Sequence, residues 1–199
     1  MLDIAFRPST AFHDTARIAS GSLATVALAV KTALATDPEA AILVFDDGTG
    51  KVIDLDLRGS DTDIAARYAP PAGATEEATD EAPRGRGRPK LGVVAREVTL
   101  LPRHWDWLAL QTGGASQALR RLVDEARKAD GGRSRARAAQ ERAYAFIATM
   151  AGDREGFEEA SRALFAGDDA RFAAHSRTWP QDIRDYAEKL LAGDDPENR

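Results

Sequence analysis

The sequence predicts an α+β fold. Three observations support this prediction: a helical spacing of apolar residues over 23–34, a strict alternation of apolar and acidic residues over 53–57, and purely helical patterns after residue 133. The 199 residues contain 43% hydrophobic side chains, which is enough for a folded core. We therefore expect a small αβ unit followed by a strand-helix-helix unit and a helical region.

The first part of the predicted N-terminal αβ unit, residues 1–69, contains a short strand and a helix. Thr10-Ala11-Phe12 favours the strand. Ser20 or Ser22 can cap the helix, whose apolar stripe runs from Leu23 to Leu34. Asp37-Pro38 is expected to end it, since proline cannot continue a helix.

The second part of this unit has the pattern of a β-hairpin. Residues 42–45 form a continuous apolar run, residues 46–50 are typical of a turn, and residues 53–57 alternate as a half-buried strand does. Asp61 is then expected to cap a short helix that carries Ile64.

Residues 70–92 change in composition and are expected to form a flexible linker. The segment opens with Pro70-Pro71, is acidic first and basic next, and holds almost no bulky apolar side chain. Such a segment buries too little surface to fold alone.

Residues 93–129 favour a strand followed by two helices. The strand is expected over 93–101, and Pro102 suits the first turn of a helix. Gly113-Gly114 should end that helix, and Ser116 should cap the next one.

Residues 133–193 are expected to form a stack of short helices. The tripeptide Ala-Gly-Asp recurs at 151–153, 166–168 and 192–194, and a phenylalanine follows the first two copies at the same distance. We interpret the repeat as punctuation in which glycine ends one helix, aspartate caps the next and phenylalanine anchors its first turn.

Composition and motifs argue against several classes of function. The chain has no cysteine, and no apolar run reaches the roughly 18–20 residues of a membrane span. We therefore expect a soluble cytoplasmic protein with no disulfide. The loop Gly48-Thr49-Gly50-Lys51 lacks the first glycine and the hydroxyl of a phosphate loop. Asp54 and Asp56 should lie on the wet face of a strand, and the three histidines have no ligand spacing. We expect no enzyme, cofactor or metal.

The charge of the chain is divided into blocks of opposite sign. Residues 1–83 hold 6 basic and 14 acidic side chains, residues 84–142 hold 14 and 6, and residues 143–199 hold 7 and 12. A positive block between negative ones favours a polyanion partner for the middle. The alternative is that the blocks attract one another, within the fold or between chains.

Within the positive block, Arg86-Gly87-Arg88-Pro89 resembles the core of an AT-hook. This resemblance implies that the two arginines enter an A·T-rich minor groove, whose narrow shape enhances its negative potential. The alternative is a solubilising basic linker. The candidate DNA-binding residues of this segment are Arg84, Arg86, Arg88 and Lys90.

Residues 94–128 resemble a ribbon-helix-helix domain. The resemblance rests on Val98-Thr99-Leu100, on Pro102 with its helix, and on the helix that opens at Ser116. It implies a homodimer whose paired strands enter the major groove, with phosphate held at the start of the second helix. Arg96, Thr99 and Ser116 are the candidate residues. The predicted outer face carries Glu97 and no lysine or arginine, so the unit can instead serve dimerisation or simply core packing.

The whole chain also resembles a bacterial family defined only as domain of unknown function 2239. The segments that carry this resemblance are Leu43-Val44-Phe45-Asp46-Asp47, Asp54-Leu55-Asp56-Leu57-Arg58-Gly59, Gly87-Arg88-Pro89-Lys90-Leu91-Gly92, Glu97-Val98-Thr99-Leu100-Leu101-Pro102-Arg103-His104-Trp105 and Gly156-Phe157-Glu158-Glu159-Ala160. It implies no activity and no site residues. Taken together, the sequence predicts a DNA-binding dimer of regulatory or nucleoid-associated type. The alternative is a protein-interaction module without a nucleic-acid role.

Overall fold

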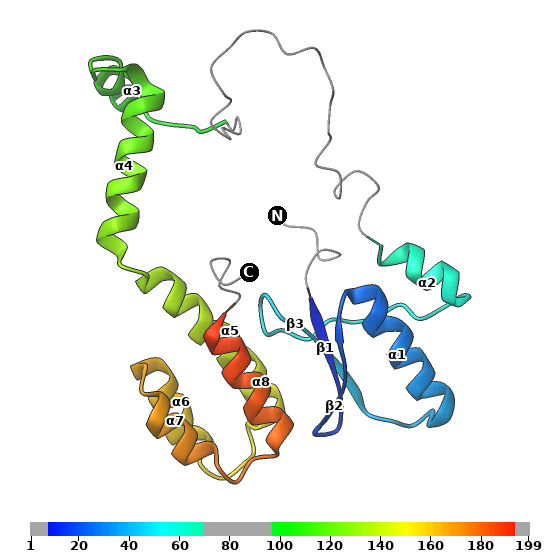
Figure 1. Cartoon of the computed structure of the whole chain (residues 1–199). Helices are drawn as coiled ribbons and strands as arrows, with labels where there is room; N and C mark the ends of the chain where they lie inside the picture. The colour runs from blue at the N-terminus through cyan, green and yellow to red at the C-terminus, as the bar shows by residue number, and fades with distance from the viewer. Residues whose placement is uncertain (1–7, 70–96, 194–199) are drawn as a thin grey trace, which may run out of the picture. The chain divides into compact units, whose positions relative to one another are not determined.

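The computed structural model describes residues 8–69 and 97–193 (Figure 1). The chain divides into two compact units. One combines residues 1–74 with residues 134–199, and the other spans residues 75–133. The first unit holds a three-stranded antiparallel sheet with helices, and the described part of the second is helical, so the predicted α+β class is confirmed. The linker predicted over 70–92 lies outside the described residues.

The sheet of the first unit is built from strands β1 (Ser9–His13), β2 (Ala16–Gly21) and β3 (Ile42–Asp46). Their order is β2-β1-β3, and β1 is antiparallel to both neighbours. The turn between β1 and β2 includes Asp14, whose φ of 51° is a left-handed conformation that aspartate tolerates. The sequence predicts β1 and β3 but not β2.

The segment 53–57, predicted as the second strand of a hairpin, forms no strand. It follows a single antiparallel bridge between Phe45 and Val52, and the Ile53 amide then donates to the Val44 carbonyl at 2.7 Å. The apolar side chains of the segment, Ile53, Leu55 and Leu57, still pack on the core. The alternation of apolar and acidic residues therefore predicted a half-buried segment correctly. The segment is held by apolar packing and not by a ladder of backbone hydrogen bonds.

Helix α1 (Leu23–Thr36) begins and ends as the sequence predicts. The Ser22 side chain caps it by accepting a hydrogen bond from the Thr25 amide, and the helix ends at Asp37. Helix α2 (Asp61–Arg67) is capped by Ser60 in a capping box with Asp63, so the predicted cap is off by one residue.

The C-terminal part of the first unit consists of α5 (Arg133–Met150), α6 (Phe157–Ala166), α7 (Asp169–Ser176) and α8 (Gln181–Ala192). The second Ala-Gly-Asp copy acts as predicted. Gly167 ends α6 with φ 68°, and the Asp168 side chain accepts from the Arg171 amide. The first copy differs, because Gly156 rather than Asp153 precedes α6.

The sheet separates two apolar clusters because successive side chains of a strand point to opposite faces. Ala11 and Val44 face α1, where they contact Val26 and Val30. Phe12 and Phe45 face the C-terminal helices, and their rings meet Phe146 of α5 at centroid distances of 5.4 and 4.9 Å. Residues from both ends of the chain thus share one core, an association that the sequence analysis, which treated 1–69 and 133–193 as separate regions, did not anticipate.

The described part of the second unit is a helical hairpin of α3 (Pro102–Ala109) and α4 (Gly114–Asp130). Pro102 occupies the first helical turn, as predicted. Residues 97–101, the described part of the strand predicted over 93–101, form no strand, because nothing in the described chain pairs with them. Ser116 is not a cap either: Gly113 precedes the helix, and Ser116 lies in its first turn.

Candidate functional site

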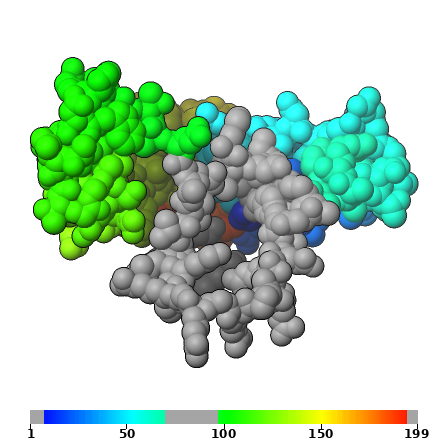
Figure 2. Space-filling view, turned by 90° about the horizontal axis from the view of Figure 1, so that it is seen from above, coloured from blue at the N-terminus to red at the C-terminus, as the bar shows by residue number. Residues whose placement is uncertain are grey.

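The α3–α4 hairpin exposes most of its large apolar side chains. Only Leu108 and Ala118 are buried among its described hydrophobic residues, at 2% exposure each. In the space-filling view the hairpin is the green surface (Figure 2). The large apolar side chains that stand exposed on it and on the segment before it are Val98, Leu101, Trp105, Trp107, Leu110, Leu122 and Val123. The hairpin therefore buries little apolar surface of its own, and exposed apolar patches of this kind are typical of interaction surfaces.

No side chain caps the start of α4, although the Gln117 carboxamide oxygen lies against Gly113. Gly113 has φ 84° and offers no side chain to the first amides of the helix, and the first turn holds no acidic residue. Ser116 is exposed in that turn, and Thr99 is exposed before α3. The other predicted DNA-binding residues, Arg84, Arg86, Arg88, Lys90 and Arg96, lie outside the described residues.

The charges of this region are solvated. Arg120, Arg121, Arg127 and Lys128 are exposed on α4, and Arg121 meets Glu125 only at 3.8 Å between two exposed side chains. Residues 97–142 hold 9 basic and 6 acidic side chains, so five of the basic side chains of the positive block fall in the segment 84–96. The described surface is therefore only mildly positive.

The first unit contains a buried polar cluster around Asp47. The carboxylate, 5% exposed, accepts hydrogen bonds from the Thr10 hydroxyl at 2.9 Å and from the Tyr186 hydroxyl at 2.6 Å. Lys189 of α8 lies 2.6 Å from its other oxygen. A charged group taken from water needs such partners, because an unpaired buried charge costs several kcal/mol.

The Asp47 cluster fastens the turn after β3 to α8 rather than forming a reactive centre. Burial, and then the hydrogen bond to Asp47, raise the pKa of Tyr186 far above its ordinary value, so its hydroxyl remains a proton donor. The turn is also packed against α5: a side-chain carbon added at Gly50 would lie 1.9 Å from the Arg142 carbonyl oxygen. We assign the cluster a structural role.

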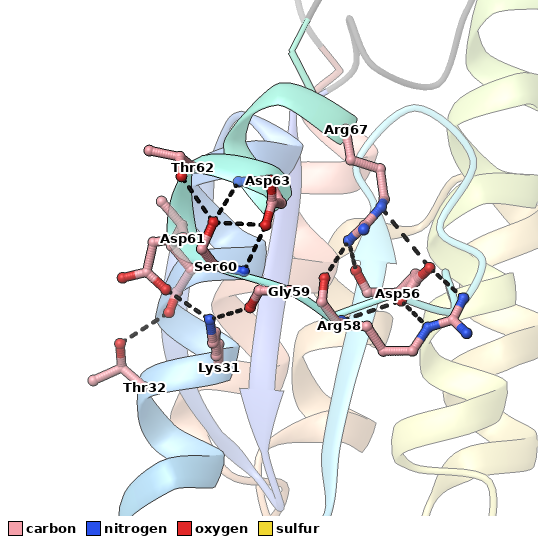
Figure 3. Close-up of polar contacts among 11 residues, drawn as sticks. Lys31, Thr32, Asp56, Arg58, Gly59, Ser60, Asp61, Thr62, Asp63 and Arg67 are labelled. Carbon is pink, nitrogen blue, oxygen red and sulfur yellow. Dashed lines mark hydrogen bonds and ion pairs between the residues drawn. The ribbon is translucent and has the colours of Figure 1, made fainter.

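The two aspartates of the alternating segment have different surroundings: Asp54 is exposed, whereas Asp56 is half-buried. Asp56 is held by Arg58, whose guanidinium nitrogens lie 2.8 and 2.7 Å from its two oxygens (Figure 3). The hydrogen bonds from Arg58 are the largest cause that lowers the pKa of Asp56, so the carboxylate stays ionised and cannot serve as a general acid at neutral pH. Arg67 adds bonds to the backbone carbonyls of Asp56 and Arg58.

The described residues contain no cluster of three or more histidine, aspartate or glutamate side chains that could hold a metal ion. No helix in residues 8–69 and 97–193 is long and apolar enough to cross a membrane. Sequence reasoning missed the Asp47 cluster, because Asp47 and Tyr186 lie 139 positions apart and nothing in either local pattern links them.

These features define an α+β protein whose three-stranded sheet carries helices on both faces and whose polar clusters are structural. A family model described as an uncharacterised protein conserved in bacteria, DUF2239, matches residues 8–191, and the chain belongs to this family. No curated protein and no solved structure matches the chain.

Proposed function

We propose that this protein binds DNA as a homodimer through residues 84–130. The observation that carries the proposal is the apolar surface of the α3–α4 hairpin, which is exposed in the single chain and directly follows the most basic segment of the sequence. A second copy of the hairpin is a natural cover, since a two-fold interface brings the same surface of both chains together.

The dimer would also provide a neighbour for residues 97–101. Among residues 8–69 and 97–193 this segment has no strand to pair with, whereas pairing with its copy would satisfy the backbone amides and carbonyls. Val98 and Leu101, at 56% and 48% exposure, would then gain apolar contacts. The proposal thus accounts for the absence of a strand in the described residues 97–101.

Two features of the dimer would meet DNA. The N-termini of the two α4 helices, which make no side-chain cap hydrogen bond, can hold backbone phosphates once Gln117 moves aside, as helix amides and the helix dipole favour negative charge. The arginines of the Arg-Gly-Arg-Pro motif would supply preference for A·T-rich minor grooves. Glu97 opposes direct reading of bases by the paired segment, so we expect the affinity to depend more on phosphates and groove shape than on base contacts.

Binding of the full chain to A·T-rich and G·C-rich duplexes of equal length, measured by fluorescence anisotropy at several salt concentrations, tests the proposal. We expect affinity to fall steeply with salt, since each phosphate contact releases counterions. Changing both Arg86 and Arg88 to alanine should weaken A·T-rich binding by roughly tenfold or more, at about 1 kcal/mol for each groove contact. Lysine at both positions should retain binding but reduce the A·T preference, because lysine lacks the planar guanidinium.

Arg171 and Arg177, both exposed in the C-terminal region, provide a matched control. Changing this pair to alanine removes the same charge and should leave binding unchanged. If both double variants lose the same DNA affinity, the basic segment contributes only its net charge to binding. Absence of salt-dependent binding to either duplex would refute the proposal and favour the protein-interaction alternative.

A further inference from the structure

The outer edge of β3 is only partly covered. β3 is an edge strand of the sheet, and the segment that follows its turn pairs with it at one bridge, Phe45 with Val52. The Asp46 amide donates to the Lys51 carbonyl at 3.0 Å, and the Ile53 amide donates to the Val44 carbonyl. Beyond Ile53 the two segments diverge, and residues 54–57 make no backbone hydrogen bond to β3 within the described chain.

The divergence leaves backbone groups of β3 facing outward. The Val44 carbonyl points away from β1, so the Val44 amide points the same way, and the antiparallel pattern puts the amide and carbonyl of Ile42 on that edge too. Among the described residues, backbone hydrogen bonds outside the β1–β3 ladder use neither the Val44 amide nor Ile42. This edge can accept a further strand.

A groove of about 270 Å³, lined mainly by residues with apolar side chains, lies along the same edge. Its lining comes from α1, from β3 and from the diverging segment, and Asp54 is its one charged member. The other lining residues are Val30, Leu34, Ala40, Ile42, Leu43, Val44, Val52, Ile53, Leu55 and Leu57. On the α1 side of the sheet, Ile42, Leu55 and Leu57 are only half-buried, so the groove leaves apolar surface that a partner would remove from water.

The charge around this edge is negative. Asp54 lines the groove, and Asp37 and Glu39 are exposed just before β3. Lys51, exposed beside Val52, only partly offsets these carboxylates. The neighbouring Asp56 does not add to the field, because Arg58 neutralises it at 2.7 Å.

We propose that this groove binds an extended segment of another protein, one with alternating apolar residues and flanking lysine or arginine. The segment would add a strand to β3 through the outward Val44 amide and the amide and carbonyl of Ile42, because the Val44 carbonyl already accepts from Ile53. Its apolar side chains would lie in the groove. Its basic residues would meet Asp54, Asp37 and Glu39. This site lies outside residues 84–130 and does not depend on DNA binding.

The probe is a fluorescein-labelled peptide, Lys-Val-Arg-Val-Thr-Val-Lys, titrated with the full chain and followed by anisotropy. We expect saturable binding and slower hydrogen exchange of the Ile42 and Val44 amides. Methylating the peptide amides along one edge should weaken binding about tenfold or more, since it removes strand hydrogen bonds and keeps every side chain. Asp54→Lys, an exposed substitution, should weaken binding several-fold.

Leu55→Asp should abolish binding, with circular dichroism reporting whether the variant folds, and Phe165→Asp, at an exposed position on α6, is the matched control. Three results would overturn the proposal: no binding of the peptide, equal binding of the methylated peptide, or wild-type affinity in Asp54→Lys. A fourth is a self-association of the full chain that Asp54→Lys or Leu55→Asp removes, because the groove would then be covered by a second copy.

Discussion

The two units of this protein differ in where their apolar side chains lie. In the first, the strands and the C-terminal helices bury large aromatic side chains such as Phe12, Phe45 and Phe146 at 0% exposure. In the second, the α3–α4 hairpin buries Leu108 and leaves Trp105 and Trp107 near half exposed. The first unit therefore has what it needs to fold as a single chain. The second has an incomplete core, and we infer that its stability depends on a partner.

Among the substitutions considered for the two units, we expect Phe146→Ala to lower the free energy of unfolding most. The ring lies at the centre of the aromatic cluster, 4.6 Å between centroids from Tyr186. Removing it should leave a cavity and lower the free energy of unfolding by about 3–5 kcal/mol. Chemical denaturation followed by circular dichroism measures this change.

Phe165 provides the control for that substitution, since it belongs to the neighbouring helix and is 49% exposed. Phe165→Ala should lower the free energy of unfolding by about 1 kcal/mol or less, because little buried surface is lost. Similar losses in both variants would mean that the shared core is not the main source of stability in the first unit.

A smaller effect is expected when charge is placed on the second unit. Leu122 and Val123, at 39% and 55% exposure, make few contacts in the single chain. Changing both to aspartate should raise the dissociation constant of the proposed dimer about 100-fold, equivalent to about 2.7 kcal/mol, by burying charge at the interface. Analytical ultracentrifugation over a concentration series measures it, and unfolding of the first unit should not change.

Phe165→Asp, which places the same charge on an exposed position of the first unit, should leave the dimer intact. A wild-type chain that sediments as a monomer at tens of micromolar would contradict the dimer itself. In that case the exposed face of α3–α4 would require a different partner.

Local chemistry explains which elements the sequence could predict. Ser22, Asp168 and Gly167 act within one or two turns of their own helices, so their patterns predict helix ends well. β2 was missed because Ala-Arg-Ile-Ala-Ser-Gly has no clear alternation, and its pairing with β1 decides its conformation. The segment 53–57 is the opposite case: its alternation predicted a strand, but the segment forms no ladder of backbone hydrogen bonds with β3.

The candidate sites were less predictable for a related reason. The contacts of Asp47 with Tyr186 and Lys189 join positions 139 and 142 residues apart, and no local pattern contains that information. The groove beside β3 likewise depends on where residues 54–57 leave the strand edge. The charge reversal at residue 84, by contrast, is a property of composition and can be counted from the sequence alone.

The smallest effect is expected at the surface pair of Asp56 and Arg58. Arg58 is 88% exposed, so Arg58→Ala should barely change stability at neutral pH, as is usual for solvated ion pairs. The substitution should instead raise the pKa of Asp56 toward its ordinary value, because it removes the largest cause of the lowered pKa. Arg67, 3.8 Å from the carboxylate, should keep the pKa partly lowered. The chemical shift of the Asp56 carboxyl carbon, followed as pH falls, measures this change.

The sign of the pH dependence follows from the direction of that shift. A carboxyl whose pKa is lowered by folding contributes stability above its unfolded pKa, near 4, and loses it as pH falls through the folded value. Wild type and Arg58→Ala should therefore differ slightly at neutral pH and converge in strong acid. A difference that stays the same as pH falls would mean that Arg58 acts through packing rather than through the charge of Asp56.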